Sequence, residues 1–199
     1  MKTLITYLIT FVLILNANVI YSQYTEQEKY DLILTLQEEK VAYDFYSEMY
    51  NKYNQKVFGN VMEAEKTHQE HVMSLINSLN IDIGDFSNTP GEFSSKEMID
   101  QYNMLIEIGG YSFTDALRAA TKYEEQDLSD LRRYASQADN ENIKSLYQCL
   151  EKATGNHLRA FVKNLKKEGI NYKPKVLSEE DYKAIINSEN EKGDCFQLK

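Results

Sequence analysis

Residues 61–68 read Val-Met-Glu-Ala-Glu-Lys-Thr-His and place a carboxylate, Glu65, three residues before an imidazole, His68. Both lie on the one stripe of a predicted helix that should be apolar, since residues at 3/4 spacing share a buried face. A carboxylate or an imidazole on such a face costs several kcal/mol unless it is paired or bound to a ligand. The stretch therefore predicts a helical protein with a buried polar site. The apolar members of the stripe are Phe58, Val61, Val72, Leu75 and Leu79.

Glu-x-x-His with both side chains facing inward is also the motif by which some four-helix bundles hold two iron or manganese ions. One copy of the motif is weak evidence, because an acidic helix can contain it by chance. The prediction depends on whether the other helices carry polar groups at the same depth.

The composition favours a single all-α domain. The chain has 199 residues with only two prolines and eight glycines, which gives enough length for one core and little punctuation for turns. Its formal charge of −9 argues against nucleic acid as a partner, because the phosphate backbone is itself negative. We find no glycine-rich phosphate loop, nucleophile elbow or Cys-His protease signature in the sequence.

The N-terminus has the pattern of a targeting segment. Lys2 precedes an apolar run, Leu4–Leu15, and polar residues follow. We therefore predict that residues 1–22 are a secretory signal peptide, cleaved after Ser22, and that the mature protein is exported to the periplasm or the extracellular space. The alternative is an uncleaved membrane anchor, because the apolar region is nearly long enough to span a bilayer. Cleavage would leave no stable membrane span.

Export would permit disulfides, but neither cysteine has the setting of a disulfide framework. Cys149 falls inside a predicted helix, and Cys195 lies in a polar tail. We expect Cys149 to be a small residue that fills the core.

Capping residues and glycines divide the rest of the chain into helices. Thr25 and Glu28 form a capping box, Asp139 is expected to cap the last long helix, and Gly109-Gly110 and Gly169 are expected to end helices. The predicted long and intermediate helices cover residues 26–53, 55–80, 95–108, 112–137 and 139–168. A turn-rich loop is predicted at 82–94 and a short helix after residue 178. The predicted domain spans 23–187, and a polar tail follows at 188–199. Four long helices, with a long connection and a short extra helix between the second and third, match a ferritin-like four-helix bundle.

The other three long helices each carry a polar residue in the middle of the apolar stripe. Glu39 interrupts the stripe of the first helix, and Glu124 interrupts that of the third, with Asp127 one turn further on. His157 interrupts the stripe of the fourth helix, whereas Glu125 shares a face with basic residues and is predicted to be solvated. This coincidence predicts a dinuclear metal site made by Glu39, Glu65, His68, Glu124, Asp127 and His157.

The charges of this set suit two divalent cations. Its four carboxylates are negative and its two imidazoles are neutral, so two such ions balance the set, and mixed carboxylate and imidazole ligation suits iron or manganese. Without metal, the carboxylates would repel one another. Simpler interpretations stay open: a buried Glu can bond a core tyrosine, His157 can be a core histidine, and Asp127 can pair with Arg132.

Segments from all four long helices share a further pattern. They are Glu38–Tyr46, Phe58–Val61, Glu65–His68, Tyr123–Leu131 and Asn156–Val162. Together they resemble the DUF2202 family, a ferritin-like group of uncharacterised bacterial and archaeal proteins, over about residues 28–187. The resemblance implies a ferritin-like fold and a metal site but no established reaction. Thr154 departs from the general ferritin-like pattern, because it stands where a second Glu-x-x-His would place its Glu, and Asp127 is the residue that could compensate.

Two classes of function remain open. In the first, the protein is an oxidase or ferroxidase: Fe(II) binds at the six residues, dioxygen oxidises it, and Tyr46 stands nearby as an accessory residue. In the second, the bundle binds metal without catalysis, for sequestration or for structure, and a metal-free interaction module is a third reading. In the oxidase, one metal would be held by Glu39, Glu65 and His68 and the other by Glu124, Asp127 and His157, with one carboxylate bridging.

Overall fold

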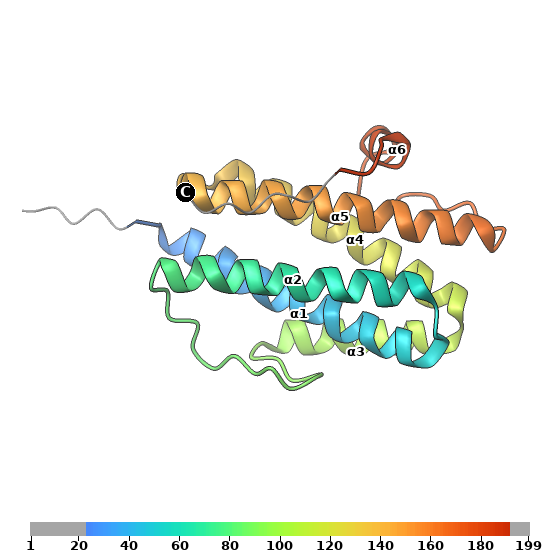
Figure 1. Ribbon diagram of the computed structural model, residues 1–199, viewed down its shortest axis with the longest axis horizontal. Coiled ribbons are helices and arrows are strands. Elements are labelled where there is room, and N and C mark those ends of the chain that lie inside the picture. Colours follow the sequence, from blue (N-terminus) through green and yellow to red (C-terminus); the bar gives the residue numbers. More distant parts are fainter. Residues whose placement is uncertain (1–22, 192–199) are drawn as a thin grey trace, which may run out of the picture.

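The computed structural model describes residues 23–191, and every regular element in that range is a helix (Figure 1). The predicted all-α bundle is confirmed at this level. The predicted signal peptide, residues 1–22, and the end of the predicted tail, residues 192–199, lie outside the described range. None of the described helices is long and apolar enough to cross a membrane. The elements are α1 (Glu26–Tyr53), α2 (Lys56–Ser78), α3 (Lys96–Tyr111), α4 (Phe113–Gln137), α5 (Glu141–Lys167) and α6 (Glu179–Asn187).

The four long helices pack as two pairs. α1 lies beside α2 and α4 lies beside α5, and the pairs meet where α2 contacts α5 and α1 contacts α4 (Figure 1). α3 packs against α1 and α4, and the short α6 lies on the outer side of α5. The segment between α2 and α3 crosses the outside of the bundle without forming a helix. All four long helices therefore run through the centre.

The prediction that Gly109-Gly110 ends a helix is wrong, because α3 continues to Tyr111. Gly109 instead allows α3 to lie close to α1. A Cβ atom at this position would lie 2.7 Å from Met49 Sδ and 2.8 Å from Phe45 Cε2, both of which are side-chain atoms of α1. The glycine is thus required by helix packing rather than by a turn.

Capping explains where the other helices begin. The capping box of α1 is confirmed, since the Thr25 side chain accepts from the Glu28 N–H and the Glu28 carboxylate accepts from the Thr25 N–H. The predicted cap of α5 is wrong by one residue: Asn140, rather than Asp139, accepts from the first N–H groups of this helix. Glu28 Oε1 accepts the N–H groups of both residues, at 2.9 and 2.7 Å, and so joins the starts of α1 and α5.

The prediction that Glu125 is solvated is also wrong. Its side chain is fully buried and accepts hydrogen bonds from the N–H groups of residues 175–177, at 2.9 to 3.2 Å, and from the Tyr172 hydroxyl, at 2.5 Å. The donors belong to the segment that follows α5 and folds back over α4. The residue pattern of α4 alone cannot show this covering segment.

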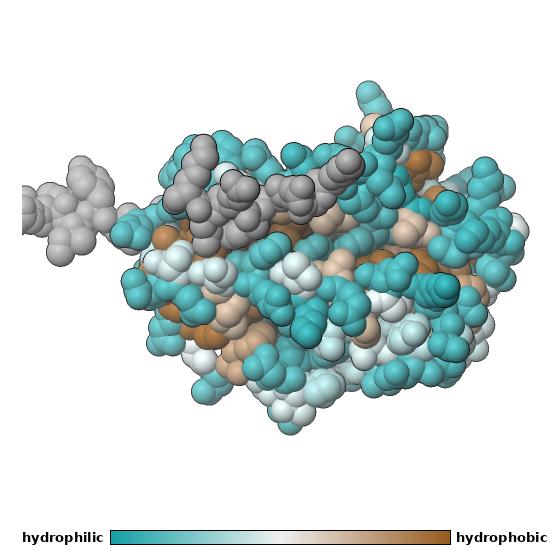
Figure 2. Space-filling view, in the orientation of Figure 1, coloured by the Kyte–Doolittle hydropathy of each residue, from teal (hydrophilic) through white to brown (hydrophobic). Residues whose placement is uncertain are grey.

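The core has two main parts, on opposite sides of the middle of the bundle. The aromatic cluster is built around Phe45, Tyr46, Phe58 and Phe161, each fully buried. The aliphatic cluster contains Leu32, Leu36, Val72, Leu75, Leu131 and Leu146, together with Tyr134 and Tyr147. Along α1, Leu32 and Leu36 of the aliphatic cluster precede Phe45 of the aromatic cluster. Along α2 the order is reversed, because Phe58 precedes Val72. On the face shown in Figure 2, hydrophilic residues predominate and hydrophobic ones show between them.

Cys149 is buried and disulfide-bonded. The expectation that it is only a core filler is therefore wrong, although its burial was predicted correctly. Helical periodicity indicates which side chains point inward, but it does not indicate whether a cysteine forms a disulfide. Cys195, the other cysteine of the sequence, lies outside the described residues.

Candidate metal centre

Five of the six predicted ligands meet between the two core clusters. Glu39 comes from α1, Glu65 and His68 from α2, Glu124 from α4 and His157 from α5, and none is more than 7% exposed. Each long helix therefore contributes at least one polar side chain at the same depth. The helical stripes place them there because each residue occupies an inward position of an otherwise apolar face.

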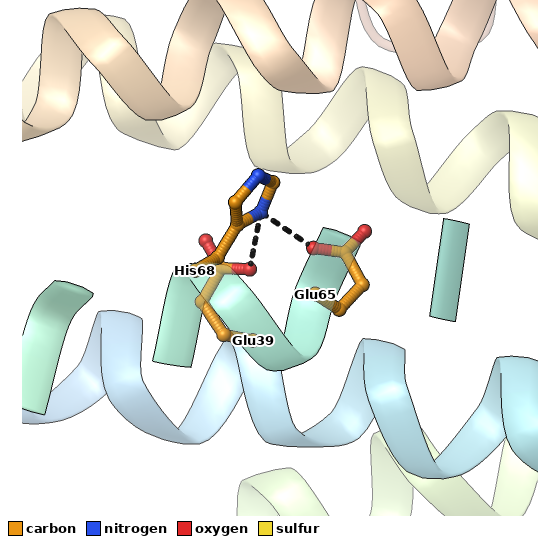
Figure 3. Close-up of side chains that lie close together, drawn as sticks. All are labelled: Glu39, Glu65 and His68. Atoms are coloured by element: carbon orange, nitrogen blue, oxygen red, sulfur yellow. Dashed lines mark hydrogen bonds and ion pairs between the residues drawn. The ribbon is translucent and has the colours of Figure 1, made fainter. Parts of the chain in front are cut away.

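The first group joins α1 and α2. His68 Nδ1 lies 2.7 Å from Glu65 Oε2 and 3.2 Å from Glu39 Oε2 (Figure 3). In Figure 3, both carboxylates point toward the same ring nitrogen. The i,i+3 spacing brings Glu65 and His68 together on one helix, and Glu39 completes the group from the neighbouring helix.

The second group joins α2, α4 and α5. His157 Nδ1 lies 3.0 Å from Glu65 Oε1 and 3.5 Å from Glu124 Oε2. The rings of His157 and His68 are stacked, with centroids 5.3 Å apart and an interplanar angle of 20°. The two oxygens of Glu65 therefore face two different histidines.

These contacts define two sets of three ligand atoms, each set lying within 4.8 Å and each able to hold one ion: Glu39 with Glu65 and His68, and Glu65 with Glu124 and His157. Glu65 belongs to both sets, so it is the carboxylate placed to bridge two ions. The sequence had assigned Asp127 to the second set, but Asp127 is in neither. Its Oδ2 accepts a hydrogen bond from the Thr154 hydroxyl at 2.8 Å.

Burial and charge act against each other in this centre. Burial raises the pKa of the Glu65 carboxyl, but His157 and His68 outweigh burial and hold the pKa well below its usual range. Burial lowers the pKa of His157, but Glu65 and Glu124 raise it to about 9. Glu39 and Glu65 likewise hold the pKa of His68 well above its usual value, against burial. Without metal, both imidazoles are therefore protonated at neutral pH.

The two outer carboxyls are harder to ionise. Burial, only partly offset by His68, raises the pKa of Glu39 to about 8. Burial also raises the pKa of Glu124, although His157 opposes it. Protons thus supply the positive charge that this acidic centre needs, and a bound cation would displace them.

Some atoms of the centre have no partner of their own. Glu39 Oε1 is fully buried without a hydrogen bond, and His157 Nδ1 makes none of ordinary geometry despite its 3.0 Å approach to Glu65. Buried polar atoms are rarely left unpaired, because each costs free energy. Oxygen and imidazole donors with unpaired atoms are the chemistry expected of residues that hold a metal ion.

Tyr46 closes the centre on the side of the aromatic cluster. Its hydroxyl donates a hydrogen bond to Glu124 Oε1, and the ring packs on Phe45, Phe58 and Phe161 at centroid distances of 5.3, 6.3 and 5.2 Å. Burial and then Glu124 raise the pKa of Tyr46 well above its usual value. The phenol therefore stays protonated and orients a carboxylate of the centre.

The sequence did not single out Gln69, the residue after His68. Gln69 Nε2 donates to the backbone carbonyls of Glu39 and Glu65, at 3.4 and 3.5 Å. These bonds link α1 to α2 directly behind two of the acidic residues. A glutamine on the edge of a polar face carries no distinguishing signal in the sequence.

Comparisons with known proteins agree with this architecture. The model of the family described as "Uncharacterized protein domain (DUF2202)" matches residues 28–189. The uncharacterised protein MJ0754 of Methanocaldococcus jannaschii is 39% identical over 169 residues, which is 85% of this chain and 91% of the relative. The crystal structure of the hypothetical protein MJ0754 from Methanococcus jannaschii is similar with a TM-score of 0.82 and 39% identity, covering 84% of this chain and 95% of that chain. The predicted resemblance is confirmed, and the chain belongs to the DUF2202 family.

Proposed function

We propose that the protein binds two divalent metal ions in the middle of its helical bundle. The observation that carries the proposal is the Glu65 carboxylate, whose two oxygens face different histidines and belong to both ligand sets. Glu39 and His68 would complete the first site, and Glu124 and His157 the second. Three protein ligands leave open positions at each ion, as in metal sites that react.

The nature of the donors supports iron or manganese. The two sets contain carboxylate oxygens and imidazole nitrogens without a thiolate, a mixture that suits these metals. Glu39, Glu65 and Glu124 carry three negative charges when ionised, against four positive charges from two divalent ions. Asp127 lies outside both sets, and burial raises its pKa well above its usual value, so it is not counted among the ionised carboxylates.

We also propose that the bundle is of the ferritin-like class. Bundles of that class bind two metals through one Glu from each of two helices and a Glu-x-x-His motif from each of the other two. Here α1 and α4 supply the single residues Glu39 and Glu124, and α2 supplies the motif. α5 supplies His157 with Thr154 in place of the second motif's Glu, so the proposed centre has one bridging carboxylate.

The reaction that we propose is oxidation of Fe(II) by dioxygen. Two Fe(II) ions supply two electrons, which with two protons convert dioxygen to hydrogen peroxide. Tyr46 would hold Glu124 in its binding orientation, and the aromatic cluster would keep water away from that side. The alternative is a bundle that binds metal without turnover, for storage or structure. Open coordination positions favour the oxidase.

Export is a further part of the proposal. The segment 1–22 has the pattern of a signal peptide, and the disulfide at Cys149 supports an oxidising compartment, where such bonds persist. Expression of the full chain in a bacterial host followed by N-terminal sequencing should give Gln23 as the first residue. Recovery of a chain that still begins at Met1 would contradict cleavage.

Metal content tests the central proposal. Mature protein incubated anaerobically with Fe(II), or with Mn(II), and then freed of excess metal should contain about two ions per chain by elemental analysis. The double variant Glu65→Ala/His68→Ala should contain none and keep its helix content by circular dichroism. Glu63→Gln, which removes a carboxylate from the exposed face of the same helix, is the matched control and should bind as the parent does. A parent protein without bound metal refutes the centre.

Oxygen consumption separates the two classes of function. The oxidase requires oxygen uptake that depends on added Fe(II), is present in Glu63→Gln and is absent from the double variant. Stoichiometric metal binding without oxygen uptake would instead establish the non-catalytic alternative.

A further inference from the structure

A groove lies between the end of α3, the first half of α4 and the segment that follows α5. Its volume is about 460 Å³, which is in the range of pockets that hold small organic molecules. Its apolar lining comes from Ile108 of α3, Ala119 of α4, and Ile170 and Tyr172 of the segment. None of the lining residues belongs to the two ligand sets of the metal centre. The groove is therefore a separate feature of the molecule.

The wall made by the segment after α5 is held in place. The chain turns back along the bundle after this helix (Figure 1), and the Ile170 N–H donates to the carbonyl of Leu165 at 2.9 Å. The Tyr172 hydroxyl and the N–H groups of residues 175–177 donate to the buried carboxylate of Glu125. Ile170 and Tyr172 also pack against the aromatic cluster. A ligand would meet a preformed wall and would not have to order it.

The opposite wall continues into an exposed apolar stripe on α3. Met104, Ile108 and Tyr111 are 44%, 39% and 73% exposed, and their 4/3 spacing places them on one face of the helix. The stripe reaches Tyr111 because α3 continues through its two glycines. Contiguous exposed apolar side chains are typical of binding surfaces. The groove can thus accept an apolar group and extend its contact along α3.

Basic side chains surround this apolar lining. They are Arg118, Lys122, Lys173 and Lys175, and among the described residues no acid lines the groove, although the whole chain has 31 acidic and 22 basic residues. Arg118 is paired with Asp115 at 2.9 Å. Within the described part of the chain, the three lysines make no ion pair. A cleft lined by charges of one sign attracts ligands of the opposite sign.

We propose that this groove binds an organic anion with an apolar body. The body would lie against Ile108 and Ile170, and the carboxylate or phosphate head group would meet Lys122 and Lys173. Lysine suits such a head group because its ammonium is a compact charge on a flexible stem. The inference goes beyond the proposed metal centre and does not depend on it.

The binding of decanoate, a ten-carbon carboxylate, tests the groove. Titration calorimetry of the mature protein should show one decanoate per chain. Decanol has the same apolar chain without the charge, so it should bind about tenfold or more weakly, because it forms no charge-assisted hydrogen bond.

Two pairs of variants locate the bound decanoate. Lys122→Glu reverses a charge at the groove and should weaken binding by about tenfold or more, whereas Lys152→Glu, at an exposed lysine of α5 outside the groove, should change it by less than about twofold. Ile108→Asp places a charge on the apolar wall and should also weaken binding by about tenfold or more. Its control is Ile99→Asp, on the same helix and similarly exposed at 37%, which should bind as the parent does.

Several results would overturn the proposal. A parent protein that binds no decanoate, or that binds decanol as tightly, has no site for an organic anion. Parent affinity in both Lys122→Glu and Ile108→Asp would place decanoate elsewhere. Adsorption to vesicles of phosphatidylglycerol without uptake of monomeric decanoate would make this surface a membrane contact instead. The variant Glu65→Ala/His68→Ala should bind decanoate as the parent does, so that failure of the groove and failure of the metal centre are distinguishable.

Discussion

The metal centre has two unlike sides. Toward the aromatic cluster it meets Tyr46, whose hydroxyl donates to Glu124 and whose ring is surrounded by other rings. Toward the aliphatic cluster lie Tyr134 and Tyr147, which are equally buried but whose hydroxyls have no hydrogen-bond partner. The satisfied hydroxyl and the packed rings hold the aromatic side of the centre in one arrangement. A buried hydroxyl without a partner costs free energy instead, so removing a hydroxyl should have different effects on the two sides.

Deleting a ring on the aromatic side should have the largest effect. Phe161 is fully buried and contacts both Tyr46 and Phe58. Phe161→Ala should lower the free energy of unfolding by about 3–5 kcal/mol, because the ring leaves a cavity that its neighbours cannot fill. Urea denaturation of the metal-free protein measures this. A loss below about 1 kcal/mol would show that this side is loosely packed.

Removing the hydrogen bond between Tyr46 and Glu124 should have the next largest effect. Tyr46→Phe keeps the ring but leaves Glu124 Oε1 without its donor. A buried acceptor that loses its donor costs about 1–3 kcal/mol, and a loss in this range is expected in urea denaturation of the metal-free protein. An unchanged free energy of unfolding would mean that Glu124 finds another donor and that Tyr46 does not orient it.

The pH dependence of stability should show that protonation of the centre stabilises the metal-free protein. In the folded protein, burial raises the pKa of Glu39 from 4.5 to about 8, and Glu65, against burial, raises that of His157 from 6.5 to about 9. Both shifts mean that the folded state binds protons more tightly than the unfolded state. The stability they contribute is complete below the unfolded pKa values and is lost as the pH rises through the folded ones.

The Tm of the metal-free protein should therefore fall by at least about 5 °C between about pH 6 and pH 9.5. Protein loaded with Mn(II) should show a smaller fall, since the cation replaces the protons. Differential scanning calorimetry of both forms measures the difference. A Tm that rises with pH in the metal-free protein contradicts the charge balance described for the centre.

The smallest effect is expected from a deletion on the aliphatic side. Tyr134→Phe removes a buried hydroxyl that has no partner, so the free energy of unfolding should change by less than about 0.5 kcal/mol or should increase. The comparison with Tyr46→Phe is direct, because both changes remove one oxygen from a buried ring. Equal losses in the two variants would erase the difference between the two sides.

Helical periodicity predicted much of the fold and of the centre. Glu39, Glu65, Glu124 and His157 were identified as inward residues because each replaces an apolar residue on a regular stripe, and the structure buries all four. Such a stripe depends only on positions within one helix. The capping residues of α1 could be predicted for the same reason, since they lie within one turn of each other.

Features that depend on two helices could not be read in this way. The choice of Glu65, rather than Asp127, as a member of the second set depends on how α2 and α4 are rotated against each other. Gly109 was taken for a helix end because the close approach of α1 is invisible in the sequence of α3. Glu125 was expected in solvent because its donors come from residues 175–177, far along the chain.

Glu124 and Glu125 are adjacent in sequence and yet lie on different faces of α4. One faces His157 inside the bundle, and the other receives the backbone of the segment that follows α5. Successive residues of a helix are separated by about 100°, so the two carboxylates together fix the rotation of α4 about its own axis. An insertion or deletion of one residue in this helix would misalign both at once. The hydrogen bonds that Glu125 accepts from the segment after α5 therefore also fix the direction in which Glu124 points.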